Sequence, residues 1–156
     1  MKEISIITII CILIDQIIKT IITNNLELYQ SIKIINNFFN ITYVRNDGAA
    51  WSILSGGRFL LILIGIISLI LIYKYFIKDK KLNNLEIITY GLLLGGIIGN
   101  LIDRIAFGYV IDFLDFLIFN YNFPVFNIAD TFIVISVFLI IIDTFRGDKN
   151  EVSSRS

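Results

Sequence analysis

Four long apolar stretches constrain this chain more than any other feature of its sequence. They cover about residues 4–22, 59–77, 85–105 and 128–145 of the 156 residues. Nineteen helical residues extend roughly 28 Å, which is close to the thickness of the hydrocarbon core of a bilayer. The sequence therefore predicts an all-α membrane protein with four transmembrane helices, organised as a single domain over residues 1–156.

The composition agrees with this prediction and excludes several kinds of chemistry. Hydrophobic residues make up 56% of the chain and charged residues only 17%, whereas a soluble domain carries roughly 25% charged residues. The 13 basic and 13 acidic residues balance, so we expect no nucleic-acid partner. The chain has no His and one Cys, which excludes Ser-His-Asp triads, His-based metal sites and internal disulfides. We expect neither a metal nor another cofactor.

The distribution of basic residues predicts how the helices are oriented. Eight of the 13 basic residues fall at the start, between the second and third stretches, or after the fourth: Lys2, Lys74, Lys78, Lys80, Lys81, Arg146, Lys149 and Arg155. The positive-inside rule then puts both termini in the cytoplasm and segments 24–57 and 106–124 outside. Short alternation at Ile32, Ile34, Ile41 and Tyr43 predicts a small β-containing element in the first outer segment. In the second, Asn120–Pro124 is expected to end any preceding helix.

The first apolar stretch has an alternative interpretation as a secretory signal peptide. No small-residue cleavage site follows it, and Asp15 and Lys19 are unusual within the apolar region of a signal peptide. We therefore favour a retained helix. Asp15 and Lys19 are four residues apart and share a helix face, so an internal ion pair is favoured over a direct catalytic role.

Two further features of the third stretch concern packing and its outer end. Gly91, Gly95 and Gly99 repeat every four residues, which predicts a smooth face for close helix packing within the molecule. Asp103 and Arg104 follow where this stretch meets the outer surface. The guanidinium there could anchor to lipid headgroups or bind a backbone carbonyl or carboxylate.

Asp112 and Asp130 are candidates for acid–base chemistry near the outer interface. Eighteen residues separate them, so they can meet only if the chain turns back between them. Two carboxylates in contact share one proton, and such a pair can activate water for attack on an amide. Asp115 is a competitor that spacing does not dismiss. A small proton-coupled transporter or a non-enzymatic membrane subunit is the alternative function, although a transport path would need charges through the membrane depth.

Five sequence blocks resemble the prolipoprotein signal peptidase family (signal peptidase II), the bacterial membrane aspartic peptidases. The blocks follow the family's order and cover most of the chain: Asp15–Lys19 is similar to D-x-x-x-K, Asn46–Ser52 to N-x-G-A-[AS]-[FW]-[SG], Gly99–Arg104 to G-N-x-x-D-R, Val110–Phe113 to V-x-D-F, and Phe126–Asp130 to F-N-x-A-D. The G-x-G-D motif of other membrane aspartyl peptidases is absent from the sequence.

The resemblance implies roles for particular residues. Asp112 and Asp130 would be the catalytic pair, and Asp115 lies outside the motif. Substrate-binding residues would be Asn46, Gly48, Asn100, Arg104 and Asn127, with supporting roles for Asp15, Lys19 and Asp103. The implied substrate is a diacylglyceryl-modified prolipoprotein, cleaved before its lipidated Cys. We expect a monomer in contact with membrane lipid, spanning the bacterial cytoplasmic (inner) membrane several times, with its active site near the extracytoplasmic face.

Overall fold

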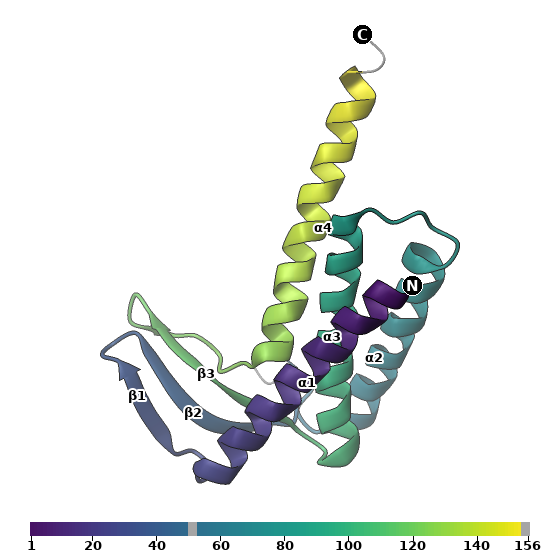
Figure 1. Ribbon diagram of the computed structural model, residues 1–156. Coiled ribbons are helices and arrows are strands. Elements are labelled where there is room, and N and C mark those ends of the chain that lie inside the picture. Colours follow the sequence, from purple (N-terminus) through teal and green to yellow (C-terminus); the bar gives the residue numbers. More distant parts are fainter. Residues whose placement is uncertain (50–52, 154–156) are drawn as a thin grey trace.

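The computed structural model describes residues 1–49 and 53–153, so Ala50, Trp51 and Ser52 of the second block lie outside the described residues. The elements follow in the order α1 (Lys2–Asn25), β1 (Ser31–Ile35), β2 (Phe39–Asn46), α2 (Arg58–Ile72), the π-helical η2 (Tyr73–Ile77), α3 (Asn84–Ala106), β3 (Val110–Ile118), β4 (Tyr121–Asn122) and α4 (Ile128–Ser153) (Figure 1).

Four helices in the described part of the chain are long and apolar enough to cross a membrane. Their apolar spans are Lys2–Asn25, Arg58–Ile77, Asn84–Ala106 and Ile128–Phe145. These four helices coincide with the four apolar stretches of the sequence, which supports a multi-pass membrane protein. Helix α3 begins with a capping box, in which Asn83 accepts a hydrogen bond from the backbone of Glu86 and Glu86 accepts one from the backbone of Asn83.

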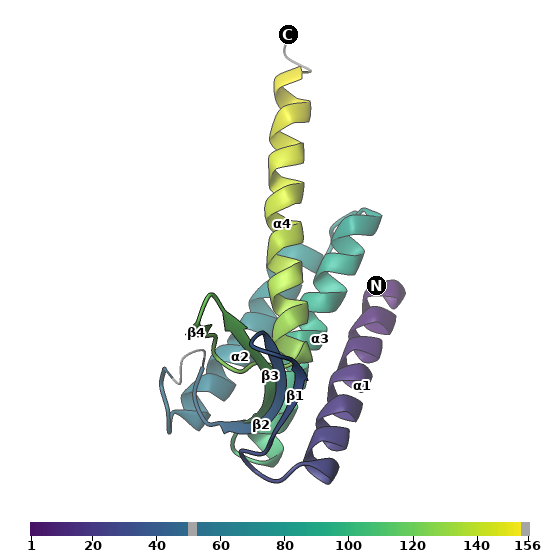
Figure 2. The same cartoon turned by 90° about the vertical axis from the view of Figure 1, so that its left-hand side faces the viewer.

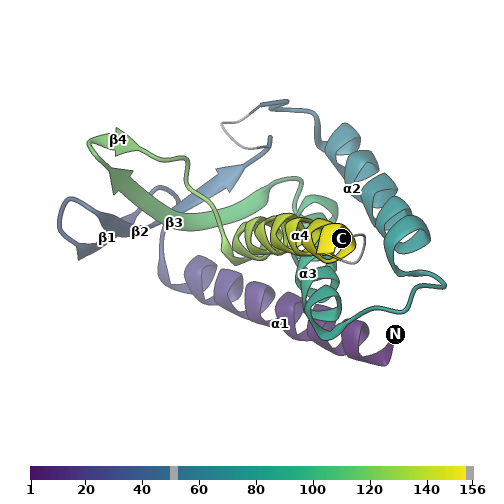
Figure 3. The same ribbon diagram turned by 90° about the horizontal axis from the view of Figure 1, so that it is seen from above.

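Helix α3 is the centre of the bundle, between α1 and α2, and it also packs along α4 (Figure 3). Its glycines permit the close approach of α1. A Cβ at Gly91 would lie 2.6 Å from Cγ2 of Ile7, and one at Gly95 would lie 2.5 Å from Cβ of Cys11. The close intramolecular packing expected from the glycine repeat is therefore confirmed for these two positions.

An antiparallel sheet in the order β1-β2-β3-β4 completes the fold. The expected all-α class is therefore too narrow, because the sheet draws strands from both outer segments. Strand β3 has the weakest signal in the sequence: its first four residues, Val110 to Phe113, are all buried, so the strand shows an apolar run rather than clear alternation. It pairs with β2 along most of its length.

The sheet lies at one end of the helix bundle, beneath the first turns of α4 (Figure 2). The N-terminus and the C-terminal part of α4 lie at the other end (Figure 1). Both ends of the described chain are thus on the same side of the bundle, and both loop segments are on the opposite side. That the side with the termini is cytoplasmic remains a prediction from the basic residues.

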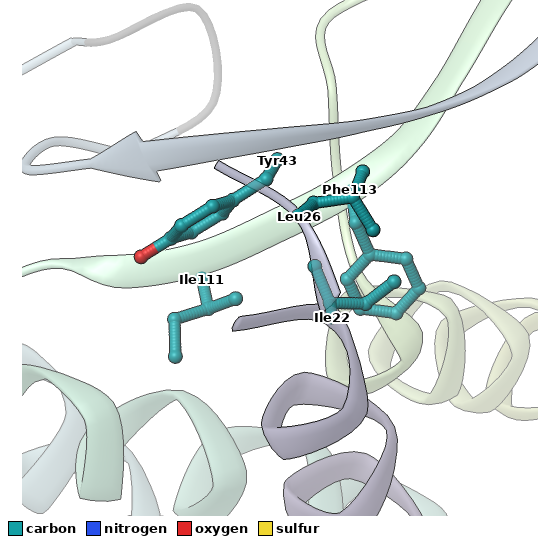
Figure 4. Close-up of a cluster of buried hydrophobic side chains, with 5 residues drawn as sticks. All are labelled: Ile22, Leu26, Tyr43, Ile111 and Phe113. Atoms are coloured by element: carbon teal, nitrogen blue, oxygen red, sulfur yellow. The ribbon is translucent and has the colours of Figure 1, made fainter. Parts of the chain in front are cut away.

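A buried apolar cluster fixes the sheet to the end of α1. It contains Ile22 and Leu26 from the end of α1, Tyr43 from β2, and Ile111 and Phe113 from β3 (Figure 4). These side chains occupy one face of β2 and β3 and hold both strands against α1. The positions of the polar side chains on the other face are thereby fixed relative to the helices. The candidate site lies on that second face.

Candidate active site

Strand β3 and helix α4 bring Asp112 and Asp130 to one pocket. The pocket has a volume of about 580 Å³, and both carboxylates line it together with Asn46, Asn100 and Arg104. The chain turns back between the two aspartates through β4, as a meeting of the pair requires. The structure therefore brings together both predicted carboxylates and three of the residues predicted to surround them.

Asp112 is almost completely buried and accepts hydrogen bonds from two side-chain amides. Nδ2 of Asn46 donates to Oδ2 at 2.9 Å, and Nδ2 of Asn127 donates to Oδ1 at 2.7 Å. Burial, followed by the negative charge of Asp130, raises the pKa of Asp112 to about 7. A carboxyl group with this pKa can hold a proton near neutral pH, as a general acid must.

Asp130 lies in the first turn of α4, where backbone N–H groups favour a negative charge. The backbone N–H of Asn127 donates to its Oδ2 at 3.2 Å, while Nδ2 of Asn100 donates to Oδ1 at 2.7 Å. Asn127 completes a reciprocal cap by accepting, at Oδ1, the backbone N–H of Asp130 at 2.9 Å. Local helix capping thus explains why an Asn precedes this aspartate by three residues.

Asn127 is the residue that connects the two carboxylates. It is fully buried, donates its side-chain amide to Asp112 and contacts Asp130 through its own backbone. The same Nδ2 also donates to Oδ1 of Asn100 at 3.1 Å. The two asparagines therefore fix the directions in which both carboxylates face the pocket.

Behind Asn100 lies a buried ion cluster formed by Lys19, Asp15 and Asp103. Nζ of Lys19 is 2.8 Å from Oδ2 of Asp15 and 2.9 Å from Oδ2 of Asp103, and all three side chains are at most 1% exposed. The same ammonium donates to Oδ1 of Asn100 at 3.2 Å. The ion pair expected between Asp15 and Lys19 is confirmed, and it does not line the pocket but connects to it through Asn100.

The two aspartates of this cluster also join their own helices, α1 for Asp15 and α3 for Asp103, to α4 and β3. Oδ1 of Asp15 accepts the backbone N–H of Ala129 in α4 at 3.0 Å, and Oδ2 of Asp103 accepts that of Ile111 in β3 at 3.1 Å. Each carboxylate therefore fixes the backbone one residue away from a pocket aspartate. Through these contacts the cluster sets the positions of Asp112 and Asp130.

Gln16 is a member of this network that the sequence did not reveal. Its Nε2 donates to Oδ1 of Asp103 at 2.9 Å, to Oδ2 of Asp15 at 3.2 Å and to the carbonyl of Gly99 at 3.3 Å. Its position next to Asp15 in the first block is the only sequence signal for it. Apart from this position, nothing in the sequence distinguishes Gln16 from a polar residue that makes no tertiary contacts.

Arg104 lines the pocket from the end of α3 and contacts the first outer segment. Its Nη2 donates to the carbonyl of Gly48 at 3.0 Å, and Gly48 N–H donates in turn to Oδ1 of Asn46. The sequence left open whether this guanidinium anchors to lipid headgroups or binds a backbone carbonyl or carboxylate. In the structure it binds a backbone carbonyl. Its Nε is buried and has no hydrogen-bond partner among the described residues. A donor of this kind can bind a carbonyl group that enters the pocket.

Asp115 is separated from the pocket by the geometry of β3. Successive side chains of a strand alternate between faces, so residues three apart point in opposite directions. Asp115 accepts hydrogen bonds from Thr42 at 2.6 Å and Asn40 at 3.4 Å instead. Asp115, which spacing alone did not dismiss, is therefore hydrogen-bonded to β2 and lies away from Asp112 and Asp130.

Comparisons with known proteins agree with the geometry. The family model described as Signal peptidase (SPase) II matches residues 7–146. The lipoprotein signal peptidases of Staphylococcus aureus strains JH9 and Newman are each 43% identical over 145 residues, covering 93% of this chain and 89% of theirs. Two solved bacterial membrane enzymes, determined by the in meso method at 2.3 and 1.9 Å resolution, superpose with TM-scores of 0.88 and 0.83. They are 41% and 42% identical, covering 96% and 92% of this chain and 92% and 93% of theirs.

Proposed function

Since this chain belongs to the signal peptidase II family and is thereby a membrane aspartic peptidase, we propose that Asp112 and Asp130 form its catalytic pair. The substrate would be a diacylglyceryl-modified prolipoprotein, and the bond cleaved would be the one before the lipidated Cys. The observation that carries this proposal is the contact of Asn127 with both carboxylates at one pocket.

In the proposed mechanism the two carboxylates share one proton. Asp112 holds it, because burial and the negative charge of Asp130 raise its pKa to about 7. Asp130 is ionised, supported by the first turn of α4 and by the amide of Asn100. Asp130 then removes a proton from water as the water attacks the scissile carbonyl, while Asp112 donates its proton to the carbonyl oxygen.

Collapse of the resulting tetrahedral intermediate needs the reverse transfers. The leaving amine receives the proton that Asp130 took from water, and the new hydroxyl returns a proton to Asp112. The pair thereby regains its single shared proton at the end of each cycle. Each cycle consumes one water and one peptide bond, and both carboxyl groups end in the protonation state in which they began.

The pocket also offers groups that would hold the substrate. The buried Nε of Arg104 is suited to a peptide carbonyl, and the contact between Arg104 and Gly48 would bring the first outer segment over the substrate. The remaining walls are mainly apolar and include Ile133 and Val134 of α4. These side chains are suited to the acyl chains of a lipidated substrate, which would remain in the membrane during cleavage.

The proposed location follows from the same geometry. The pocket lies at the end of the bundle that carries the sheet, opposite the termini. With the termini in the cytoplasm, the active site would be near the extracytoplasmic face of the bacterial inner membrane. We propose that the protein acts there as a monomer. The family assignment favours this peptidase over the transporter considered from the sequence.

The test uses purified protein in detergent and a diacylglyceryl-modified precursor. We expect Asp112→Asn and Asp130→Asn each to lower kcat by about 10³-fold or more, since removing one member of a catalytic unit removes the action of the whole. Asp115→Asn is the matched control, because it removes a carboxylate from the same strand but from the other face. It should retain activity within a few-fold of the unaltered enzyme.

Two results would contradict the proposal. Substantial cleavage by either pocket variant would remove that aspartate from the catalytic pair. Efficient cleavage of an unmodified precursor would show that the lipid is not required. Thermal unfolding of each variant accompanies the assay, so that loss of activity is distinguished from loss of the fold.

A further inference from the structure

A second cavity lies on the face of β2 and β3 that points away from Asp112. Its volume is about 330 Å³, and it opens between the sheet and the outer ends of α1 and α3. The register of the strands explains the separation: Arg45 pairs with Ile111, whereas Asn46 pairs with Val110 and Val44 with Asp112. Since neighbouring residues of a strand face opposite ways, Arg45 points into the second cavity and Asn46 toward the pocket of the aspartates.

Arg45 is held in a fixed orientation at this cavity. Its Nε donates to the hydroxyl of Tyr43 at 3.0 Å, and its guanidinium lies over the ring of Tyr109, 4.8 Å from the centroid. The hydroxyl of Tyr43 points away from Leu26 and Phe113 of the apolar cluster (Figure 4). Tyr43 and Tyr109 both line this cavity. Two aromatic hydroxyls and a guanidinium therefore converge at one place.

Arg45 has no opposite charge beside it in the part of the chain that the structure describes. Among the side chains that the structure describes, the two ion pairs are those of Lys19, and no carboxylate lies within ion-pair distance of Arg45. Among the described residues, the terminal nitrogens of its guanidinium have no hydrogen-bond partner. A planar guanidinium with free terminal N–H groups matches the oxygens of a phosphate in a two-pronged contact.

The other walls of the cavity determine what kind of phosphate compound fits. Leu26 and Leu28 follow the end of α1, and Phe107 follows the end of α3, where its side chain is 54% exposed. This apolar surface adjoins the guanidinium at the end of the membrane-spanning helices. A phosphate ion would leave it uncovered, whereas a glycerolipid would place its phosphate on Arg45 and its glycerol and upper acyl carbons on these side chains.

We propose that this cavity is a binding site for the phosphate-bearing headgroup of a membrane glycerolipid, with Arg45 as its anchor and the hydroxyls of Tyr43 and Tyr109 as further hydrogen-bonding groups. The bound lipid would hold the sheet at the membrane surface from the side opposite the aspartates. The site is independent of the peptidase mechanism, since none of these three residues contacts Asp112 or Asp130.

Native mass spectrometry of the purified full chain tests the proposal, with phosphatidylglycerol as the probe. We expect Arg45→Gln to weaken its binding by about tenfold, the effect of losing a charge-assisted contact at an exposed site. Arg45→Lys retains the charge but not the fork and should weaken binding by about threefold. Lys33→Gln is the matched control, because it removes an exposed charge from β1 of the same sheet without altering the cavity. Its binding should equal that of the unaltered chain.

Two further probes identify the source of the phosphate. Diacylglycerol has the same chains without the phosphate and should bind equally to the unaltered chain and Arg45→Gln. Inorganic phosphate should not displace phosphatidylglycerol at millimolar concentration. Equal losses in Arg45→Gln and Lys33→Gln would overturn the proposal, as would no loss in either Arg45 variant. Displacement by inorganic phosphate would overturn the assignment to a lipid.

Discussion

Replacing Lys19 with Met is expected to destabilise the protein more than any exposed substitution, because it removes the cation from a buried cluster. Its ammonium makes two contacts, at 2.8 and 2.9 Å, to carboxylates that are fully buried. Breaking a buried ion pair by removing one partner costs about 3–5 kcal/mol. Asp15 and Asp103 retain donors in Gln16 and the backbone, so we expect a loss near the lower end of that range, about 3 kcal/mol.

The assay is reversible unfolding in mixed detergent micelles, followed by circular dichroism, for the single variants and their combination. Asp103→Asn by itself should cost little, since Lys19 keeps Asp15 as its partner and the substituted amide oxygen would still accept the backbone N–H of Ile111. In Lys19→Met combined with Asp103→Asn, one uncompensated charge disappears. The combination should therefore be more stable than Lys19→Met alone, by about 1–2 kcal/mol.

The exposed Lys33 of β1 provides the control, because Lys33→Met removes a charge from a solvated strand and should change the unfolding free energy by less than about 0.5 kcal/mol. A loss below about 1 kcal/mol for Lys19→Met would refute the reasoning, since the cluster would then contribute no more than a surface ion pair. Strictly additive effects of the Lys19 and Asp103 substitutions would refute it as well.

Three other changes test the site and its support. Asn127→Ala should lower kcat by about 10²-fold with a smaller change in KM, because both carboxylates lose a shared orienting contact; single-turnover cleavage measures it. The kcat/KM of the unaltered enzyme should fall above about pH 7, where Asp112 with its raised pKa loses the proton that the pair shares with Asp130. The same raised pKa means that the folded protein holds this proton more tightly than the unfolded chain, so its contribution to the unfolding free energy decreases from about pH 4 to pH 7 in pH-dependent unfolding. Gly99→Ala should cost about 1–3 kcal/mol in thermal unfolding, since the new Cβ would lie 2.7 Å from Oδ2 of Asp15, which the ion cluster prevents from moving.

The helices and the two aspartates were accessible from the sequence because each carries a local signal. A run such as residues 59–77 is long enough to span a bilayer whatever its neighbours, and the observed span is Arg58–Ile77. The blocks around Asp112 and Asp130 were recognisable by resemblance, and both residues line one pocket. By contrast, Gln16 acquires its contacts only when α1 packs on α3, so its role depends on tertiary structure.

Strand β3 could not be inferred for a different reason. Its sequence from Val110 to Ile118 is apolar apart from Asp112 and Asp115, and a short apolar run does not distinguish a buried strand from a helical segment. The distinction determines the chemistry. In a helix, residues three apart share a face, so Asp112 and Asp115 could both have reached the pocket. In the strand these two side chains point to opposite faces, and only Asp112 lines the pocket.

The irregular pairing of β2 with β3 also determines which side chain of β2 lies beside Asp112. Ile41 pairs with Leu114 but Val44 pairs with Asp112, so two residues of β2 stand opposite one residue of β3. In a regular ladder continued from Ile41, Arg45 would pair with Val110 and would share the face of Asp112, while Asn46 would point away. The extra residue reverses that outcome. It directs the amide of Asn46 to Asp112 and keeps the guanidinium of Arg45 on the opposite face. A further positive charge beside Asp112 would favour its ionised form, so this bulge helps to keep the pKa of Asp112 raised by holding Arg45 on the opposite face.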